Sequence, residues 1–146
     1  VSGELDLTMH GPSLKLDSKP YSKRRAIYGY IDRQNISPTL NSFDFANPNI
    51  HAPQRVETTV PQQALFAFNH PFVIERSASL AKRALESQNG DSSSMVEFLY
   101  RQILSREPRK DEIKLGAEFL TNHAKLANLE DLAQTLLVSN EFFFTD

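Results

Sequence analysis

The chain has 146 residues, with 16 lysines and arginines against 18 aspartates and glutamates, and it contains no cysteine and no tryptophan. This length suits one domain, and 40% apolar with 23% charged residues is close to the globular average, which argues against wholesale disorder. The lack of cysteine excludes disulfides, thiolate nucleophiles, zinc–thiolate sites, iron–sulfur clusters and covalently attached haem. A net charge of −2 gives no electrostatic reason to expect nucleic acid as a partner.

The organisation of the chain follows from its apolar runs and its first residues. No apolar run approaches the 18 or more residues of a membrane-spanning helix, and no signal peptide is visible. The sequence begins Val1-Ser2-Gly3 without a methionine, so we interpret it as a fragment of a longer protein. We expect a single domain over residues 1–146, with an extended, loop-rich leader over 1–58 and helices over 59–146.

The leader combines short alternating segments with turn-forming residues. Apolar and polar residues alternate from Leu5 to Met9 and again from Leu14 to Leu16, which predicts a loose hairpin. The β-favouring side chains in residues 24–31 predict a further strand. Residues 43–48 are typical of a strand end or turn, and five of the eight prolines precede residue 60. The leader is therefore expected to be irregular and partly extended.

The helical part begins with a start signal at residue 59. Thr59 is a good N-cap, Pro61 suits the first turn, and Gln62 three residues on completes a capping box. The following residues predict a short helix that is buried nearly all round and ends before Pro71. A broad apolar stripe then predicts a longer helix from Pro71.

Three more helices are expected downstream. Ser94 and Glu97 form a second capping box, Pro108 starts another helix, and Asn128 caps the last one. The carboxylates of residues 107, 111 and 112 lie at a helix start, where the helix dipole favours anions. The predicted fold class is mainly α: a helical bundle of about five helices preceded by an irregular, partly β-extended N-terminal segment.

Several segments, taken in their order along the chain, resemble one known family. They are Arg24 to Tyr28, Asp44-Phe45, Arg55 to Leu65, Asn69 to Phe72, Leu99 to Arg101, Arg106 to Pro108, and Ser139 to Phe142. Over roughly residues 20–146 the chain resembles a planctomycete-specific domain of unknown function, which lies C-terminal in large exported proteins that often carry a planctomycete cytochrome c domain. The resemblance brings no established activity.

What the resemblance implies concerns context. It implies a periplasmic or cell-envelope location and the adjacent domain of the parent chain as a partner. Haem, if present, would belong to another domain, and no cofactor is expected in this segment. Carbohydrate is a possible ligand on the same ground.

The polar residues of the family-like segments are the candidate ligand site: Asp44, Arg55, Thr59, Gln63 and Asn69. The Arg55 guanidinium could bind a carboxylate, phosphate or sulfate, and Asp44 could orient it or bind sugar hydroxyls. The alternative is a polar network that ties the leader to the first long helix, because buried polar groups must be paired. We favour the network.

The aromatic run at the chain end is the candidate interface. Phe142, Phe143 and Phe144 cover most of the circumference of a helix, so one bundle face cannot bury all three. Either this tail folds over the core of its own domain, or one ring contacts a neighbouring domain or partner. We favour docking within the domain.

No catalytic or metal motif is recognised. The four histidines, at positions 10, 51, 70 and 123, form no close pair and no HExxH, and His70 is expected to help the turn before Pro71. We predict a non-catalytic structural or interaction module of an exported multidomain protein. The alternative is a ligand-binding or enzyme part-domain that acts on polysaccharide or sulfated sugar together with the upstream domain.

Overall fold

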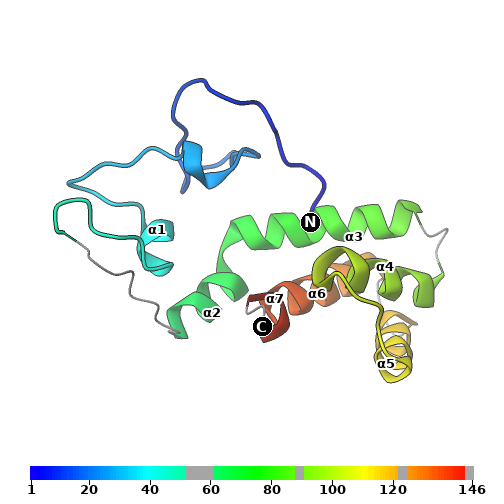
Figure 1. Cartoon of the computed structure of the whole chain (residues 1–146). Helices are drawn as coiled ribbons and strands as arrows, with labels where there is room; N and C mark the ends of the chain where they lie inside the picture. Colours follow the sequence, from blue (N-terminus) through cyan, green and yellow to red (C-terminus); the bar gives the residue numbers. More distant parts are fainter. Residues whose placement is uncertain (52–60, 88–90, 122–124, 144–146) are drawn as a thin grey trace. The chain divides into compact units, whose positions relative to one another are not determined.

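The computed structural model describes residues 1–51, 61–87, 91–121 and 125–143, and it is mainly helical (Figure 1). Its elements are the 3-10 helix η1 (Ala26–Tyr28) and the helices α1 (Pro38–Ser42), α2 (Pro61–Asn69), α3 (Pro71–Ser87), α4 (Ser92–Leu104), α5 (Lys110–Thr121), α6 (Lys125–Val138) and α7 (Asn140–Phe143). Five α-helices have seven residues or more, which confirms the predicted helical class and number. No described helix is long and apolar enough to cross a membrane.

The chain divides into two compact units. One, here called the leader unit, comprises residues 4–66. The other, the helical unit, comprises residues 1–3 and 67–146. Helix α2 contributes residues to both.

The leader unit contains isolated β-bridges where the sequence predicted a hairpin. Asp6 pairs with Arg24 and Leu14 pairs with Gly29, and both bridges are parallel. The predicted pairing of residues 5–9 with 14–16 is therefore wrong, because each segment bonds instead to the stretch around η1. That stretch is a 3-10 turn flanked by the bridges, where a strand was expected. The alternation of apolar and polar residues indicated an extended backbone, but it did not indicate which segment that backbone would pair with.

Arg24 holds the turn between these segments. Its Nη2 donates to the backbone oxygen of Thr8 at 3.0 Å and also to that of His10, and its guanidinium lies 4.0 Å from the centre of the Tyr28 ring. The neighbouring ammonium of Lys23 pairs with the Glu4 carboxylate at 2.8 Å. Both basic residues thus fasten the leader unit from within.

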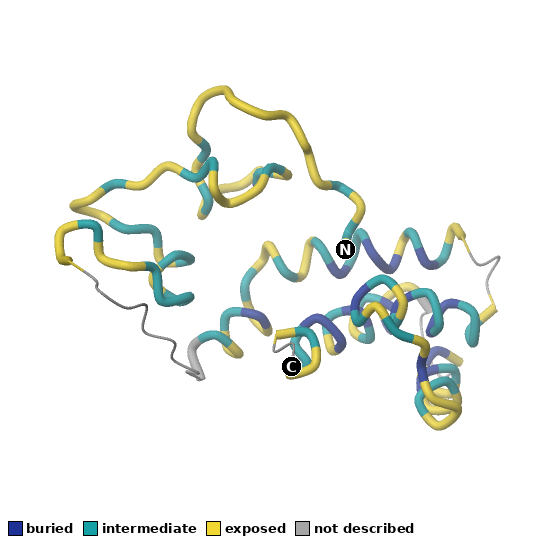
Figure 2. The backbone as a smooth tube through the Cα atoms, in the orientation of Figure 1, coloured by how far each residue is buried: buried dark blue, intermediate teal, exposed yellow. Residues whose placement is uncertain are grey.

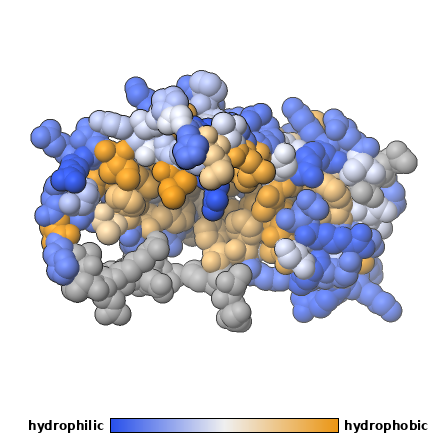
Figure 3. All heavy atoms as spheres, turned by 45° about the horizontal axis from the view of Figure 1, so that its top comes forward, coloured by the Kyte–Doolittle hydropathy of each residue, from blue (hydrophilic) through white to orange (hydrophobic). Residues whose placement is uncertain are grey.

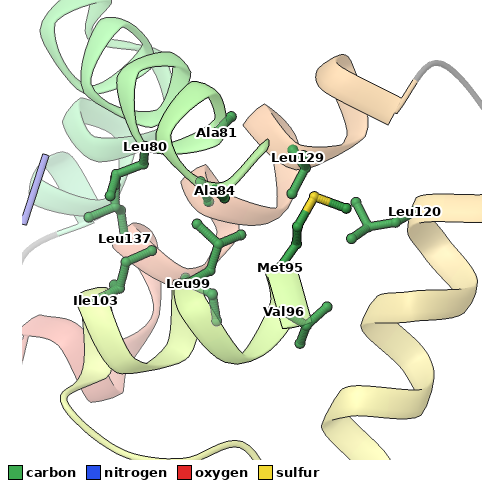
Figure 4. Close-up of a cluster of buried hydrophobic side chains, with 12 residues drawn as sticks. Leu80, Ala81, Ala84, Met95, Val96, Leu99, Ile103, Leu120, Leu129 and Leu137 are labelled. Carbon is green, nitrogen blue, oxygen red and sulfur yellow. The ribbon is translucent and has the colours of Figure 1, made fainter. Parts of the chain in front are cut away.

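The core of the described chain lies in the helical unit. Its buried apolar side chains come from α3, α4, α5 and α6, and Figure 2 shows dark blue concentrated on these helices. In the close-up of Figure 4, Leu80 of α3, Leu99 of α4 and Leu137 of α6 converge on one cluster. All three are less than a tenth exposed. Burial of such side chains, at about 1.5–3 kcal/mol each, is the main force that holds these helices together.

Two helix boundaries differ from the sequence prediction. Helix α4 begins earlier than Ser94, because the Asp91 carboxylate accepts the Ser94 backbone N–H at 2.8 Å and acts as the N-cap. Helix α6 begins at Lys125, so Asn128 lies within the helix and does not cap it. Its buried side-chain amide instead donates to the backbone oxygen of Phe119 at 2.8 Å, near the end of α5. One side chain therefore ties two helices together across a turn.

The junction of α2 and α3 follows the prediction. α2 ends at Asn69 and α3 begins at Pro71. The His70 oxygen accepts the Val73 N–H at 2.9 Å, and the His70 ring nitrogen Nδ1 accepts the Phe72 N–H at 3.2 Å. His70 thus serves the turn, as expected. In the helical unit, the Gln134 side chain also donates to the Phe68 oxygen at 2.6 Å and so gives a backbone carbonyl near the end of α2 a hydrogen-bond partner.

Candidate functional site

Two members of the predicted ligand site lie together in the leader unit. Asp44 follows α1 in a left-handed backbone conformation, with φ of 53°. The side-chain amide of Gln63, from α2, donates to Asp44 Oδ2 at 3.3 Å. The rings of Phe43 and Phe66 meet edge to face beside them, with centroids 5.1 Å apart. A polar pair and an aromatic pair thus join the end of α1 to α2.

The positions of the other three members differ in how far the structure describes them. Arg55 and Thr59 lie outside the described residues. Asn69 is exposed at the last position of α2. The contact that the structure adds to the sequence prediction is therefore the hydrogen bond between Gln63 and Asp44.

The leader unit also holds an open pocket of about 320 Å³ that the sequence did not indicate. Its lining includes the side chains of Lys15, Asp17, Tyr30, Asp32 and Asn35. Asp17 accepts a hydrogen bond from the Thr39 hydroxyl, and Asp32 Oδ1 accepts the Gln34 N–H at 2.9 Å. Two carboxylates against one ammonium make this a mildly acidic pocket beside an exposed aromatic ring.

The strongest charge cluster lies in the helical unit, around Arg106 between α4 and α5. The Arg106 guanidinium binds Glu112 with two parallel bonds, of 2.8 and 2.9 Å. It also binds both carboxylate oxygens of Glu141 on α7, one of them at 2.9 Å and the other through Nε. A planar fork that grips two carboxylates is the geometry for which arginine is suited. We call these three side chains the Arg106 clasp.

One member of the clasp, Glu112, also caps the N-terminus of α5. Glu112 Oε2 accepts the Arg109 backbone N–H at 2.6 Å, which is the carboxylate half of a capping box. The Arg106 hydrogen bonds, joined by this backbone bond, lower the pKa of Glu112 to about 2. Hydrogen bonds to Arg106 also lower the pKa of Glu141. The hydrogen bonds to Glu112 and Glu141 in turn raise the pKa of Arg106.

An aromatic ring and a second ion pair accompany the clasp at the end of α4. The Tyr100 ring lies 5.1 Å from the Arg106 guanidinium carbon, and burial raises the pKa of its hydroxyl above the usual range. Arg101 Nε pairs with Glu107 at 2.7 Å. The sequence explained residues 107, 111 and 112 by the helix dipole, whereas each of these carboxylates in fact pairs with an arginine. The long-range partner Glu141 was missed, because nothing in the spacing marks a contact across 35 positions.

The C-terminal aromatic run divides in the structure. Phe142 is half-buried and packs against the core of the helical unit, in line with docking inside the domain. Phe143 remains 37% exposed and meets Phe142 edge to face, with centroids 5.8 Å apart. Phe144 lies outside the described residues. The clasp contributes to this docking, since it holds the preceding residue, Glu141.

No group of three or more metal-ligating side chains occurs within the described ranges of the chain. On the face drawn in Figure 3, apolar surface (orange) reaches solvent among polar residues.

In a comparison with known families, a family model matches residues 1–120, a range that contains Arg106 and Glu112 but not Glu141. It begins earlier and ends earlier than the expected resemblance over residues 20–146. No curated protein and no solved structure matches the chain. The chain belongs to the PSD1 family, which is described as a protein of unknown function (DUF1553).

Proposed function

We propose that this chain is a non-catalytic structural and interaction module of an exported multidomain protein of planctomycete type, in the periplasm or cell envelope. In this role its polar residues fasten chain segments to each other, and its exposed surface contacts the adjacent domain of the parent chain. The location and the domain context come from the family resemblance.

The observation that supports the proposal most directly is the bond between Gln63 and Asp44. These are two of the residues best suited to hold a ligand, and they are directed at each other across 19 positions of sequence. The Arg106 clasp repeats the pattern, because its three charged groups satisfy one another and leave α7 attached to the start of α5. Charged groups paired in this way are more typical of a fastened scaffold than of an open site.

The experiment compares Gln63→Ala with Gln34→Ala as a matched control, since the Gln34 side chain is exposed in the same unit. A fastening role predicts that Gln63→Ala exposes the leader unit to limited proteolysis while Gln34→Ala does not. Co-expression with the upstream domain is expected to give a stable complex with both variants. Unchanged proteolysis of Gln63→Ala, or the absence of any association, would contradict the proposal.

The acidic pocket favours a second candidate, the binding of a neutral saccharide. Carboxylates, an amide and an exposed aromatic face suit sugar hydroxyls and ring faces, whereas two carboxylates against one ammonium disfavour a sulfated sugar. Titration of labelled chain with cellohexaose is expected to shift amide resonances near Tyr30 and Asp32, and Tyr30→Ala is expected to abolish the shifts. Equal shifts with heparin-derived oligosaccharide, or none with either, would reject this candidate.

A further inference from the structure

The outer side of α5 carries a strip of apolar surface that the helical unit does not cover. Leu115 is 67% exposed and Phe119 is 43% exposed. They lie four positions apart, so their side chains are neighbours on one side of the helix. α5 packs against α4 and α6 through buried Gly116 and Leu120 instead. We call Leu115 and Phe119 the α5 strip.

One edge of the α5 strip is lined by a cation and an anion. Lys114 and Glu118, also four positions apart, are both exposed and follow one another along the same edge of the helix. Within the described ranges, neither side chain belongs to an ion pair. Lysine placed before glutamate is the weaker orientation for a pair within one helix, so both charges remain available to a partner.

The order of these residues is self-complementary for antiparallel pairing. A two-fold axis perpendicular to the helix places the same edge of both copies on the same side. Lys114 then lies opposite Glu118 of the partner subunit, and Leu115 lies opposite Phe119 of the partner subunit. Parallel pairing would put the charged edges on opposite sides of the contact, where they could not meet.

We propose that α5 is a self-association surface on which a second copy of this chain packs antiparallel through the α5 strip, with two symmetric pairs between Lys114 and Glu118. The alternating charge favours a second copy over an acidic or basic partner, which would call for an edge of one sign. The strip offers two apolar side chains per copy, less than the roughly 800 Å² per partner of a standard interface. The association is therefore weak and depends on concentration.

The test is sedimentation equilibrium of the full chain from about 10 μM to about 1 mM, the range in which weak association is measured. The expected result is a reversible monomer–dimer equilibrium. Leu115→Glu is expected to raise the dissociation constant by at least about tenfold. The reason is that each of the two copies would have to bury a carboxylate in the symmetric contact. Ile74→Glu is the matched control, since Ile74 is an exposed apolar residue of α3, and it should leave the constant unchanged. Circular dichroism verifies that both variants remain helical.

A charge exchange tests the antiparallel geometry. Lys114→Glu and Glu118→Lys should each weaken the dimer, and the double exchange should restore it, because each reversal occurs twice about the two-fold axis. All of these residues are exposed, so the fold is expected to tolerate every change. A chain that stays monomeric at all concentrations, a dimer unaffected by Leu115→Glu, or a double exchange that fails to restore association would each overturn the proposal.

Discussion

Single side chains close the ends of helices in this protein, and Asn128 is the clearest case. Its amide is 7% exposed and bonds to the Phe119 oxygen, so one residue of α6 satisfies a backbone acceptor of α5. Helix ends leave such carbonyls without a partner inside the helix. A residue expected from the sequence to start a helix instead completes its neighbour.

Replacement of Asn128 by alanine is expected to lower the free energy of unfolding by about 1 kcal/mol, the usual net contribution of a hydrogen bond, because its bond to the Phe119 oxygen is part-buried. Urea denaturation at neutral pH measures this loss. Gln134→Ala is the control, because its bond to the Phe68 oxygen is exposed and water can replace it. Equal losses for both variants would show that burial of the amide is not the source of the effect.

Gly116 makes the second prediction at the scale of one residue. A methyl group at this position would lie 2.7 Å from Val96 Cγ2, too close for two carbons. Gly116→Ala is therefore expected to destabilise the chain by about 1 to 2 kcal/mol, since overpacking outweighs the gain of about 1 kcal/mol in helix propensity. Thermal denaturation followed by circular dichroism measures the change.

A second substitution, at Val96, provides the control for this prediction. Combined with Val96→Ala, the same glycine substitution is expected to become neutral or stabilising, because the new methyl group fills space that the valine vacates. Simple additivity of the two single losses would show that the contact between α4 and α5 adjusts without strain.

Among whole elements, α7 depends most on charge. It is a short helix of four residues, Asn140–Phe143, and isolated helices of this length are not stable in water. Two contacts retain it: Phe142 packs on the core, and Glu141 enters the Arg106 clasp. The clasp therefore joins Phe142 in holding α7 on the helical unit.

The clasp predicts a pH dependence of stability. The pKa of Glu112 is about 2 in the folded chain against 4.5 for the free group, so its contribution is complete above pH 4.5 and is lost as the pH falls toward 2. The free energy of unfolding should therefore fall across this window in the native chain. Glu112→Gln should show a shallower fall, because the titrating group has been removed.

The same position separates the ion pair from the helix cap. Glutamine at a third helical position still accepts the backbone N–H of a capping box, so Glu112→Gln keeps the cap but removes the charge and one of the two parallel bonds to Arg106. At neutral pH we expect it to cost about 1 to 2 kcal/mol, and Glu112→Ala to cost about 1 kcal/mol more. Identical losses would mean that the pairing with Arg106, and not the cap, carries the contribution of Glu112.

On the scale of the whole molecule, burial is divided unevenly between the two units. Among the described residues of the leader unit, Tyr21 is the only buried apolar residue. The helical unit holds the entire cluster formed by α3 to α6. Because apolar burial supplies most of the folding free energy, the helical unit is expected to be the cooperative part of the chain.

A fragment of residues 61–146 is therefore expected to fold by itself, with α-helical circular dichroism and a cooperative thermal transition. A fragment of residues 1–66 should show no cooperative transition, since it lacks a core of comparable size. Differential scanning calorimetry of both fragments and of the full chain tests this. An unfolded 61–146 fragment would show that the leader contributes to the core in a way the burial pattern does not reveal.

The sequence by itself predicted the elements whose signals are local. The boundary at His70 and Pro71 was predicted because proline restricts the backbone of its neighbour, and the long amphipathic helix after it because apolar side chains recur with helical spacing. Of the predicted ligand site, Gln63 and Asp44 bond to each other, and their role in holding a ligand stays a prediction. Arg55 and Thr59, and the end of the aromatic run, lie outside the described residues, so their roles stay predictions.

The tertiary structure decided every feature that depends on a distant partner. The extended leader segments form single bridges with the η1 stretch because alternation specifies which residues face together and leaves the partner open. Asn128 serves α5, and Arg106 reaches Glu141, because packing of α4, α5 and α6 brings these groups within hydrogen-bonding distance. Local preferences act over one or two turns of chain, whereas pairing of charges and burial of side chains depend on positions in space. The sequence therefore determined a helical chain with an extended leader, and the fold determined which of its polar groups hold it together.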